Sequence, residues 1–185
     1  MIVGVDPQVM VSKYAALTDA IRSRDADAIQ QASEVDRAIV AKIKPALQSS
    51  SFATKARLRM PVLLKVNDLM EKSVVPLDTS EVSCEHVLPQ NVPKEYAIWH
   101  QKFRTSDGKR YNGAVYRHRL GNLTILEHNL NREAGSRPFD EKKSTIGRST
   151  HALARDCARY ADWNADVVDG RTERLTSMLL KHWDF

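Results

Sequence analysis

Four side chains of this chain follow one another in an order that suits metal-assisted hydrolysis. Glu85 and His86 are adjacent in a short apolar stretch that Pro89 closes, and Asn131 lies nine positions after Asn122. A carboxylate can hold a divalent ion, a neutral imidazole can accept a proton from water, and amides can orient a loop or complete a metal site. These residue types indicate the chemistry of a one-metal nuclease.

The segments that carry the first pair predict a strand. Residues 83–88 form a short run with Cys, Val and Leu that ends at a proline, which favours a β-strand. On a regular strand, Glu85 and His86 point to opposite faces. For both to reach one site, we expect the strand to bend or end at this point.

The segments that carry the asparagines predict a second strand and a helix. Residues 123–126 are a second β-prone run, entered through Gly121, and residues 127–134 form a short helical segment ended by Gly135. The chain can then fold back, so that Asn131 on this helix faces the end of the first strand. The expected local structure is a β-β-α unit.

These motifs together resemble a known family. The stretches Glu-His-Val-Leu-Pro-Gln at 85–90, Leu-Gly-Asn-Leu-Thr-Ile-Leu at 120–126, Leu-Asn at 130–131 and Pro-Phe-Asp-Glu-Lys at 138–142 carry the likeness. They resemble the HNH-type nuclease domain at the C-terminus of GmrSD-type restriction endonucleases, and similar domains of SspE-type nickases in phosphorothioate DNA defence. The stretch from Trp163 to Trp183 also resembles the terminal helix of that family.

The resemblance implies a mainly α (α+β) fold, in which a ββα-metal HNH core is embedded in a helical domain. We expect an N-terminal helical region over 1–73, the nuclease core over 74–140, and C-terminal helices over 141–185 that pack on the core.

The resemblance also implies a role for each motif residue. His86 would be the general base, and Asn122 would be the amide that holds the loop and orients His86. Glu85 and Asn131 would be the metal ligands. Lys142 matches a basic position that could hold a phosphate.

Two of these assignments have close competitors. Asn129 lies two residues before Asn131, and residues two apart on a helix face different directions, so at most one is expected to be a ligand. Lys143 competes with Lys142 for the phosphate in the same way.

The other histidines and the tryptophans have structural interpretations. His128 could be a metal ligand, but a surface position on a helix is favoured, and His118 is expected to touch phosphate or solvent. Trp99, Trp163 and Trp183 are expected in the core more than as platforms for stacked bases.

The charge distribution favours a polyanionic partner. The net charge is +5 and the pI is about 9.3, while residues 101–148 alone hold eleven Lys or Arg against five acids. Such a patch binds phosphates in a salt-dependent manner, although a solvated basic face is the plain alternative. The expected DNA contacts are Arg117, Arg119, Lys142 and Lys143.

The ligand types predict the metal and the outcome of the reaction. One carboxylate and one amide make a weak, hard oxygen site, which favours Mg²⁺ or Mn²⁺. A single site cuts one strand, so we expect a DNA nickase, and the resemblance implies that it belongs to a bacterial antiphage restriction system. The alternatives are a DNA-binding or sensing module that needs a partner NTPase domain for activity, and a helical interaction domain in which the motif is coincidental. The resemblance implies an N-terminal NTPase or modification-sensing domain or subunit as the partner, and no P-loop is found in the sequence itself.

The remaining sequence predicts helices and a reducing compartment. Cys84 and Cys157 have no metal-type spacing and are expected to be free thiols, and neither a signal peptide nor a membrane span is evident, so a cytoplasmic protein is expected.

Apolar residues recur at helical spacing over 7–72, where we expect Pro45 and the serines 49–51 to break the helix and Pro61 to start or kink another.

Three further elements are predicted downstream. We expect a short helix over 92–103 after Pro93, and a loop or hairpin over 104–115 from its Asp-Gly and Asn-Gly pairs. From Phe139 onward the pattern is helical again, and Asn164 can cap the last helix.

Overall fold

The computed structural model describes residues 7–33, 37–71, 79–104 and 112–183. The protein is mainly helical with one two-stranded antiparallel sheet, so the predicted mainly α (α+β) class is confirmed. The chain forms two compact units, Met1–Ala46 and Leu47–Phe185. None of the helices in the described ranges has the length and apolar character that a membrane crossing requires.

The first unit is built from helices. It contains α1 (Pro7–Ser23), α2 (Ala26–Ser33) and most of α3 (Arg37–Gln48). The prediction that Pro45 ends a helix is wrong, because α3 continues through it to Gln48. Pro45 lies close to the C-terminal end of the helix, so the hydrogen bond that it cannot donate is lost where the helix is about to end.

In the second unit, α4 (Ala56–Glu71) leads into the sheet region. Pro61 lies inside α4, so it does not start the helix, which begins five residues earlier. The side chain of Asn67 is buried, and its Oδ1 accepts a hydrogen bond of 3.1 Å from the backbone N–H of Leu153. The helix that precedes the motif is thereby fixed to the chain that follows it.

The predicted β-β-α order is confirmed. Strand β1 (Val82–His86) pairs with β2 (Leu123–Glu127) in antiparallel register, with Glu85 opposite Thr124 and His86 opposite Leu123. Helix α7 (His128–Ala134) follows directly and ends at Gly135, whose φ of +54° places it in the region that favours glycine. A 3-10 turn at Leu120–Asn122 brings the chain into β2.

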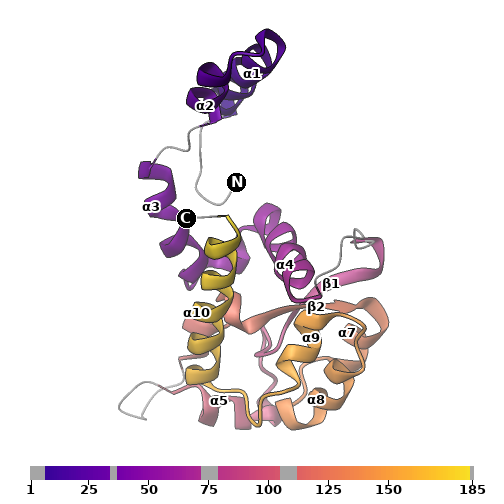
Figure 1. Ribbon diagram of the computed structural model, residues 1–185. Coiled ribbons are helices and arrows are strands. Elements are labelled where there is room, and N and C mark those ends of the chain that lie inside the picture. The colour runs from indigo at the N-terminus through magenta and orange to yellow at the C-terminus, as the bar shows by residue number, and fades with distance from the viewer. Residues whose placement is uncertain (1–6, 34–36, 72–78, 105–111, 184–185) are drawn as a thin grey trace. The chain divides into compact units, whose positions relative to one another are not determined.

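Helices cover the strand pair on both sides. In Figure 1, α4 lies on one side of the strands, and α7, α8 (Phe139–Gly147) and α9 (Ala152–Cys157) lie on the other. Both α4 and α9 contact β2, and α8 packs against α7 and α9. Glu127, at the end of β2, accepts hydrogen bonds of 2.8 Å from the Ser149 hydroxyl and from the N–H and hydroxyl of Thr150. The loop between α8 and α9 is therefore attached to the sheet.

The region between the strands differs in detail from the prediction. The helix expected over 92–103 is divided into a 3-10 turn at Lys94–Tyr96 and the short helix α5 (Ile98–Lys102). Most of the expected hairpin over 104–115 falls on 105–111, which lie outside the described residues. At its end, Gly113 begins a short helix, α6 (Gly113–Tyr116), and not a strand.

Aromatic residues form much of the core of the second unit. Trp99 and Trp163 are completely buried, which confirms their expected core position, whereas Trp183 is half-buried. The ring of Trp99 lies 6.1 Å from that of Phe103, and the ring of Trp163 lies 5.3 Å from that of Phe139, measured between centroids.

The last helix, α10 (Ala165–His182), packs against the 3-10 turn that precedes β2. Its N-terminus is capped as predicted, because Asn164 Oδ1 accepts a hydrogen bond from Val167 N at 3.1 Å. Gly121 approaches the helix so closely that an added Cβ would lie 2.0 Å from the carbonyl oxygen of Val168. Only glycine fits at this contact.

Arg171 of α10 joins several segments through one buried guanidinium. Its NH1 donates to the carbonyl oxygens of Gly121 and Leu123, both at 2.8 Å, and its Nε donates to Asp156 at 3.0 Å. The guanidinium also lies over the Trp163 ring, 5.8 Å from its centroid. The C-terminal helix thereby fixes the entry to β2, where Asn122 is found.

Candidate active site

Asn122 holds the chain immediately after His86. Its side chain is completely buried, and its Oδ1 accepts hydrogen bonds from Leu88 N at 2.8 Å and from Trp163 Nε1 at 3.0 Å. Its Nδ2 donates to the carbonyl oxygens of Leu88 and Arg117, both at 2.9 Å. One amide therefore connects the end of β1, the loop before β2 and the segment before α10.

His86 lies at the end of β1 in a polar environment. Gln90 Nε2 lies 3.1 Å from His86 Nδ1, and the ring of His118 meets the His86 ring edge-on with centroids 5.4 Å apart. Burial lowers the pKa of His86 to about 3, and the nearby His118 and Arg59 contribute to the same direction. The imidazole is neutral at pH 7, so its unprotonated ring nitrogen, which depends on the tautomer, can accept a proton.

Glu85 has different neighbours, as strand alternation requires. Its Oε1 lies 2.7 Å from Nζ of Lys142, whose side chain is completely buried and also donates to the carbonyl oxygen of Val87 at 3.1 Å. Burial raises the pKa of Glu85 and lowers that of Lys142, while their attraction opposes both shifts. The strand ends at His86, and the two residues share Lys142 as a neighbour, because its Nζ also lies 3.5 Å from the His86 carbonyl oxygen.

The asparagine of α7 that approaches β1 is Asn131. Its Nδ2 donates to Ser83 Oγ at 2.7 Å, and Ser83 shares a strand face with Glu85 because the two are two residues apart. Asn129 is exposed. His128 is also exposed, with Nε2 3.0 Å from the Ser80 carbonyl oxygen, which agrees with the favoured surface position.

An open depression lies next to Asn131. It has a volume of about 460 Å³ and is lined by Ser83, His128, Asn131 and Arg132. In the part of the chain that the structure describes, no group of three or more His, Cys, Asp or Glu side chains is placed to hold a metal ion. A metal site here would therefore depend on amide, water and phosphate oxygens beside a single carboxylate.

The four expected DNA contacts have different positions. Arg117 is half-buried near His86, and Lys143 is also half-buried. Arg119 forms an ion pair with Asp169, and its guanidinium lies over the Tyr116 ring at 5.1 Å from the centroid. Lys142 faces the interior and not the solvent, so in this conformation it contacts Glu85 in place of a phosphate.

One basic residue near His86 has no signal in the sequence. Arg59 is on α4, well before the motif, yet its charge acts on His86 and on His118. In the sequence, nothing distinguishes Arg59 from an ordinary arginine on the surface of a helix. Only the packing of α4 against the sheet reveals its place.

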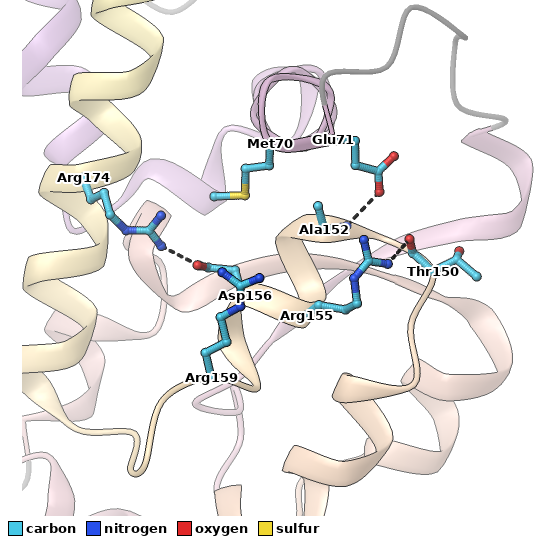
Figure 2. A pocket seen from close by; sticks show the side chains of 8 residues that line it. All are labelled: Met70, Glu71, Thr150, Ala152, Arg155, Asp156, Arg159 and Arg174. Atoms are coloured by element: carbon cyan, nitrogen blue, oxygen red, sulfur yellow. Dashed lines mark hydrogen bonds and ion pairs between the residues drawn. The ribbon is translucent and has the colours of Figure 1, made fainter.

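The larger depression of the described residues is elsewhere. It measures about 570 Å³ and lies between α4, α9 and α10 (Figure 2), and its lining consists of Met70, Glu71, Thr150, Ala152, Arg155, Asp156, Arg159 and Arg174. Most of its charged groups already have partners in the protein. Arg174 pairs with Asp156 at 2.5 Å, Arg155 donates to the Thr150 carbonyl, and Glu71 accepts from Ala152 N at 2.8 Å. The hydrogen bond between Glu71 and Ala152 in its lining joins α4 to α9, and the lining contains none of the motif residues.

The comparison with known families identifies the class of domain that carries the Glu-His and asparagine motifs. The family model of the C-terminal domain of GmrSD restriction endonucleases matches residues 39–178. The chain belongs to this family. Comparison with curated proteins finds no match.

Proposed function

We propose that this domain is an HNH-type, metal-dependent DNA endonuclease that nicks DNA in a bacterial antiphage restriction system. Its family supports a restriction-type nuclease. The observation that carries the finer proposal is the position of His86. A neutral imidazole lies at a strand end that Asn122 fixes, and the charges of Arg59 and Arg117 act on it.

His86 acts as the general base in this proposal. The neutral ring accepts a proton from the attacking water, while Gln90 Nε2, 3.1 Å from Nδ1, limits the orientation of the ring. The cations around His86 contribute to its low pKa, so a bound phosphate would offset part of their effect. The base would then become stronger when the substrate is present.

Glu85 and Asn131 are the proposed ligands of Mg²⁺ or Mn²⁺. Asn131 uses its Nδ2 on Ser83, which leaves its carbonyl oxygen for a cation, and Ser83 shares a strand face with Glu85. The Lys142 ammonium, 2.7 Å from Glu85, supports the idea that this carboxylate attracts a cation. When bound, the ion would stabilise the charge that develops on the leaving 3′ oxygen.

The ion would share the Glu85 carboxylate with Lys142 or displace it. In this proposal Lys142 compensates Glu85 until the metal and the DNA bind. Its ammonium is then available for a phosphate oxygen. A domain with one such site cuts one strand, and an N-terminal NTPase or modification-sensing domain or subunit is the proposed partner.

The test is the conversion of supercoiled plasmid to open circles with Mg²⁺, Mn²⁺ or EDTA. His86→Ala should reduce nicking by about 10²–10⁴-fold and leave DNA binding nearly intact, because a general base acts mainly in the transition state. His182→Ala is a matched control, because His182 is exposed at the C-terminal end of α10 and is not one of the motif residues. Equal nicking by wild type and His86→Ala would exclude His86 as the base.

A metal titration tests the ligands. Asn131→Ala should require more Mn²⁺ for the same nicking rate, whereas Asn129→Ala should behave as wild type because Asn129 is exposed. If Asn129→Ala shifts the metal requirement instead, the assignment of Asn131 is incorrect.

The second candidate is a DNA-binding or sensing module without its own catalysis. The buried Lys142–Glu85 pair favours it, since Glu85 is already compensated by a cation. DNA binding without nicking in every metal would support this candidate.

A further inference from the structure

Three basic side chains gather around His86 from two separate segments. His118 and Arg117 come from the loop before β2, and Arg59 comes from α4. The backbone of Ala53 joins them, because its N–H donates to the His118 carbonyl at 2.8 Å and its carbonyl accepts from Arg59 NH1 at 3.3 Å. The His118 ring in turn lies against that of His86.

Within the described ranges, no carboxylate compensates the arginines of this group. Among the residues described, neither Arg59 nor Arg117 has a carboxylate within ion-pair distance, whereas the neighbouring Arg119 is paired with Asp169. Burial, Arg117 and Arg59 also lower the pKa of His118, so its ring is neutral at pH 7. Two uncompensated guanidinium groups therefore flank two neutral imidazoles.

The same side chains have nitrogen atoms without hydrogen-bond partners. In the described part of the chain, Nε of Arg59, Nε of Arg117 and Nδ1 of His118 are buried and unpaired. A buried donor without a partner is unfavourable. Neighbouring atoms cover these nitrogens, so an external ligand would bind the outer nitrogens of the same side chains. The unpaired atoms indicate that the described residues do not satisfy all the nitrogens of this group.

We propose that Arg59, Arg117 and His118 form a subsite for a phosphodiester of the DNA strand that His86 attacks. This inference rests on the proposed nuclease function and deepens it. Planar guanidinium groups match phosphate oxygens in geometry and charge, and the neutral His118 ring can add a hydrogen bond. The helix before the motif, α4, thereby contributes a substrate contact to the active site.

The test measures binding of a fluorescent DNA duplex to the full chain in EDTA over a series of NaCl concentrations. Arg59→Gln and Arg117→Gln should each reduce the slope of log K against log salt by about 0.9, the effect of losing one phosphate contact. Arg57→Gln is the matched control on the same helix, because Arg57 is exposed, and its slope should equal that of wild type. Arg59→Lys keeps the charge and should keep the slope. His118→Gln should weaken binding without changing the slope, since the ring is neutral.

Circular dichroism confirms that each variant is folded before its slope is compared. Wild-type slopes for both Arg59→Gln and Arg117→Gln, or no DNA binding by the wild type at low salt, would overturn the subsite. If the two variants have reduced slopes but the wild-type chain nicks DNA with neither Mg²⁺ nor Mn²⁺, the subsite is supported and the nuclease proposal is excluded. If both variants nick DNA at the wild-type rate and bind it with the wild-type salt slope, the subsite is excluded and the nuclease proposal stands.

Discussion

Replacing Asn122 by alanine tests the central structural interaction of the site. The substitution removes four hydrogen bonds of a completely buried amide, at 2.8, 2.9, 2.9 and 3.0 Å. Each contributes about 1 kcal/mol net, so we expect the free energy of unfolding to fall by roughly 4 kcal/mol. For a chain of this size, Tm should fall by roughly 8–16 °C.

The assay is chemical denaturation followed by tryptophan fluorescence. Trp163 donates one of the lost hydrogen bonds, so its emission reports directly on the second compact unit. Asn129→Ala is the control, because this exposed asparagine should change the free energy of unfolding by less than about 0.5 kcal/mol. A loss of less than about 1 kcal/mol for Asn122→Ala would refute the argument that its amide fixes the end of β1.

Three further predictions concern packing, the buried ion pair and acid stability. Gly121→Ala should lower Tm strongly in thermal unfolding, because its Cβ would meet a backbone oxygen at 2.0 Å, whereas Gly170→Ala, with nothing within 4 Å, should raise it slightly. In urea unfolding, Lys142→Met should lower the free energy of unfolding by about 3–5 kcal/mol, because it leaves Glu85 buried and unpaired. Adding Glu85→Gln should restore much of this loss. A double variant as unstable as Lys142→Met would argue against the importance of the ion pair. Hydrogen bonds outweigh the effect of burial and lower the pKa of Glu127, so this carboxylate stabilises the fold above its unfolded pKa of about 4.3 and the stabilisation is lost as pH falls through the folded value. The difference in free energy of unfolding between wild type and Glu127→Gln should therefore become smaller from pH 6 to pH 3. A constant difference would contradict this.

Local patterns were sufficient to predict the β-β-α unit. Short β-prone runs, a proline and a C-terminal glycine are signals carried by adjacent residues, and β1, β2 and α7 lie within a residue or two of the expected ranges. The cap at Asn164 is local in the same sense. Pro45 misled the prediction, because α3 continues through it, and Pro61 lies inside α4 instead of starting it.

The partners of the site residues could not be predicted, since they depend on contacts between distant segments. Lys142 and Glu85 are far apart in sequence, and nothing near either residue indicates that a lysine becomes completely buried. Arg59 reaches the neighbourhood of His86 only because α4 packs on the sheet. The motif spacing can identify which residues are candidates, but tertiary packing decides which of them face each other.

The hydrogen bonds of Arg171 have a consequence for the order of events during synthesis. The carbonyls of Gly121 and Leu123 receive their side-chain donor from a helix near the end of the described chain, and Asn122 receives one of its donors from Trp163. Residues 85–131 leave the ribosome before these partners exist. The contacts around Asn122 are therefore completed only when translation of this domain is almost finished, so truncated nascent chains lack them.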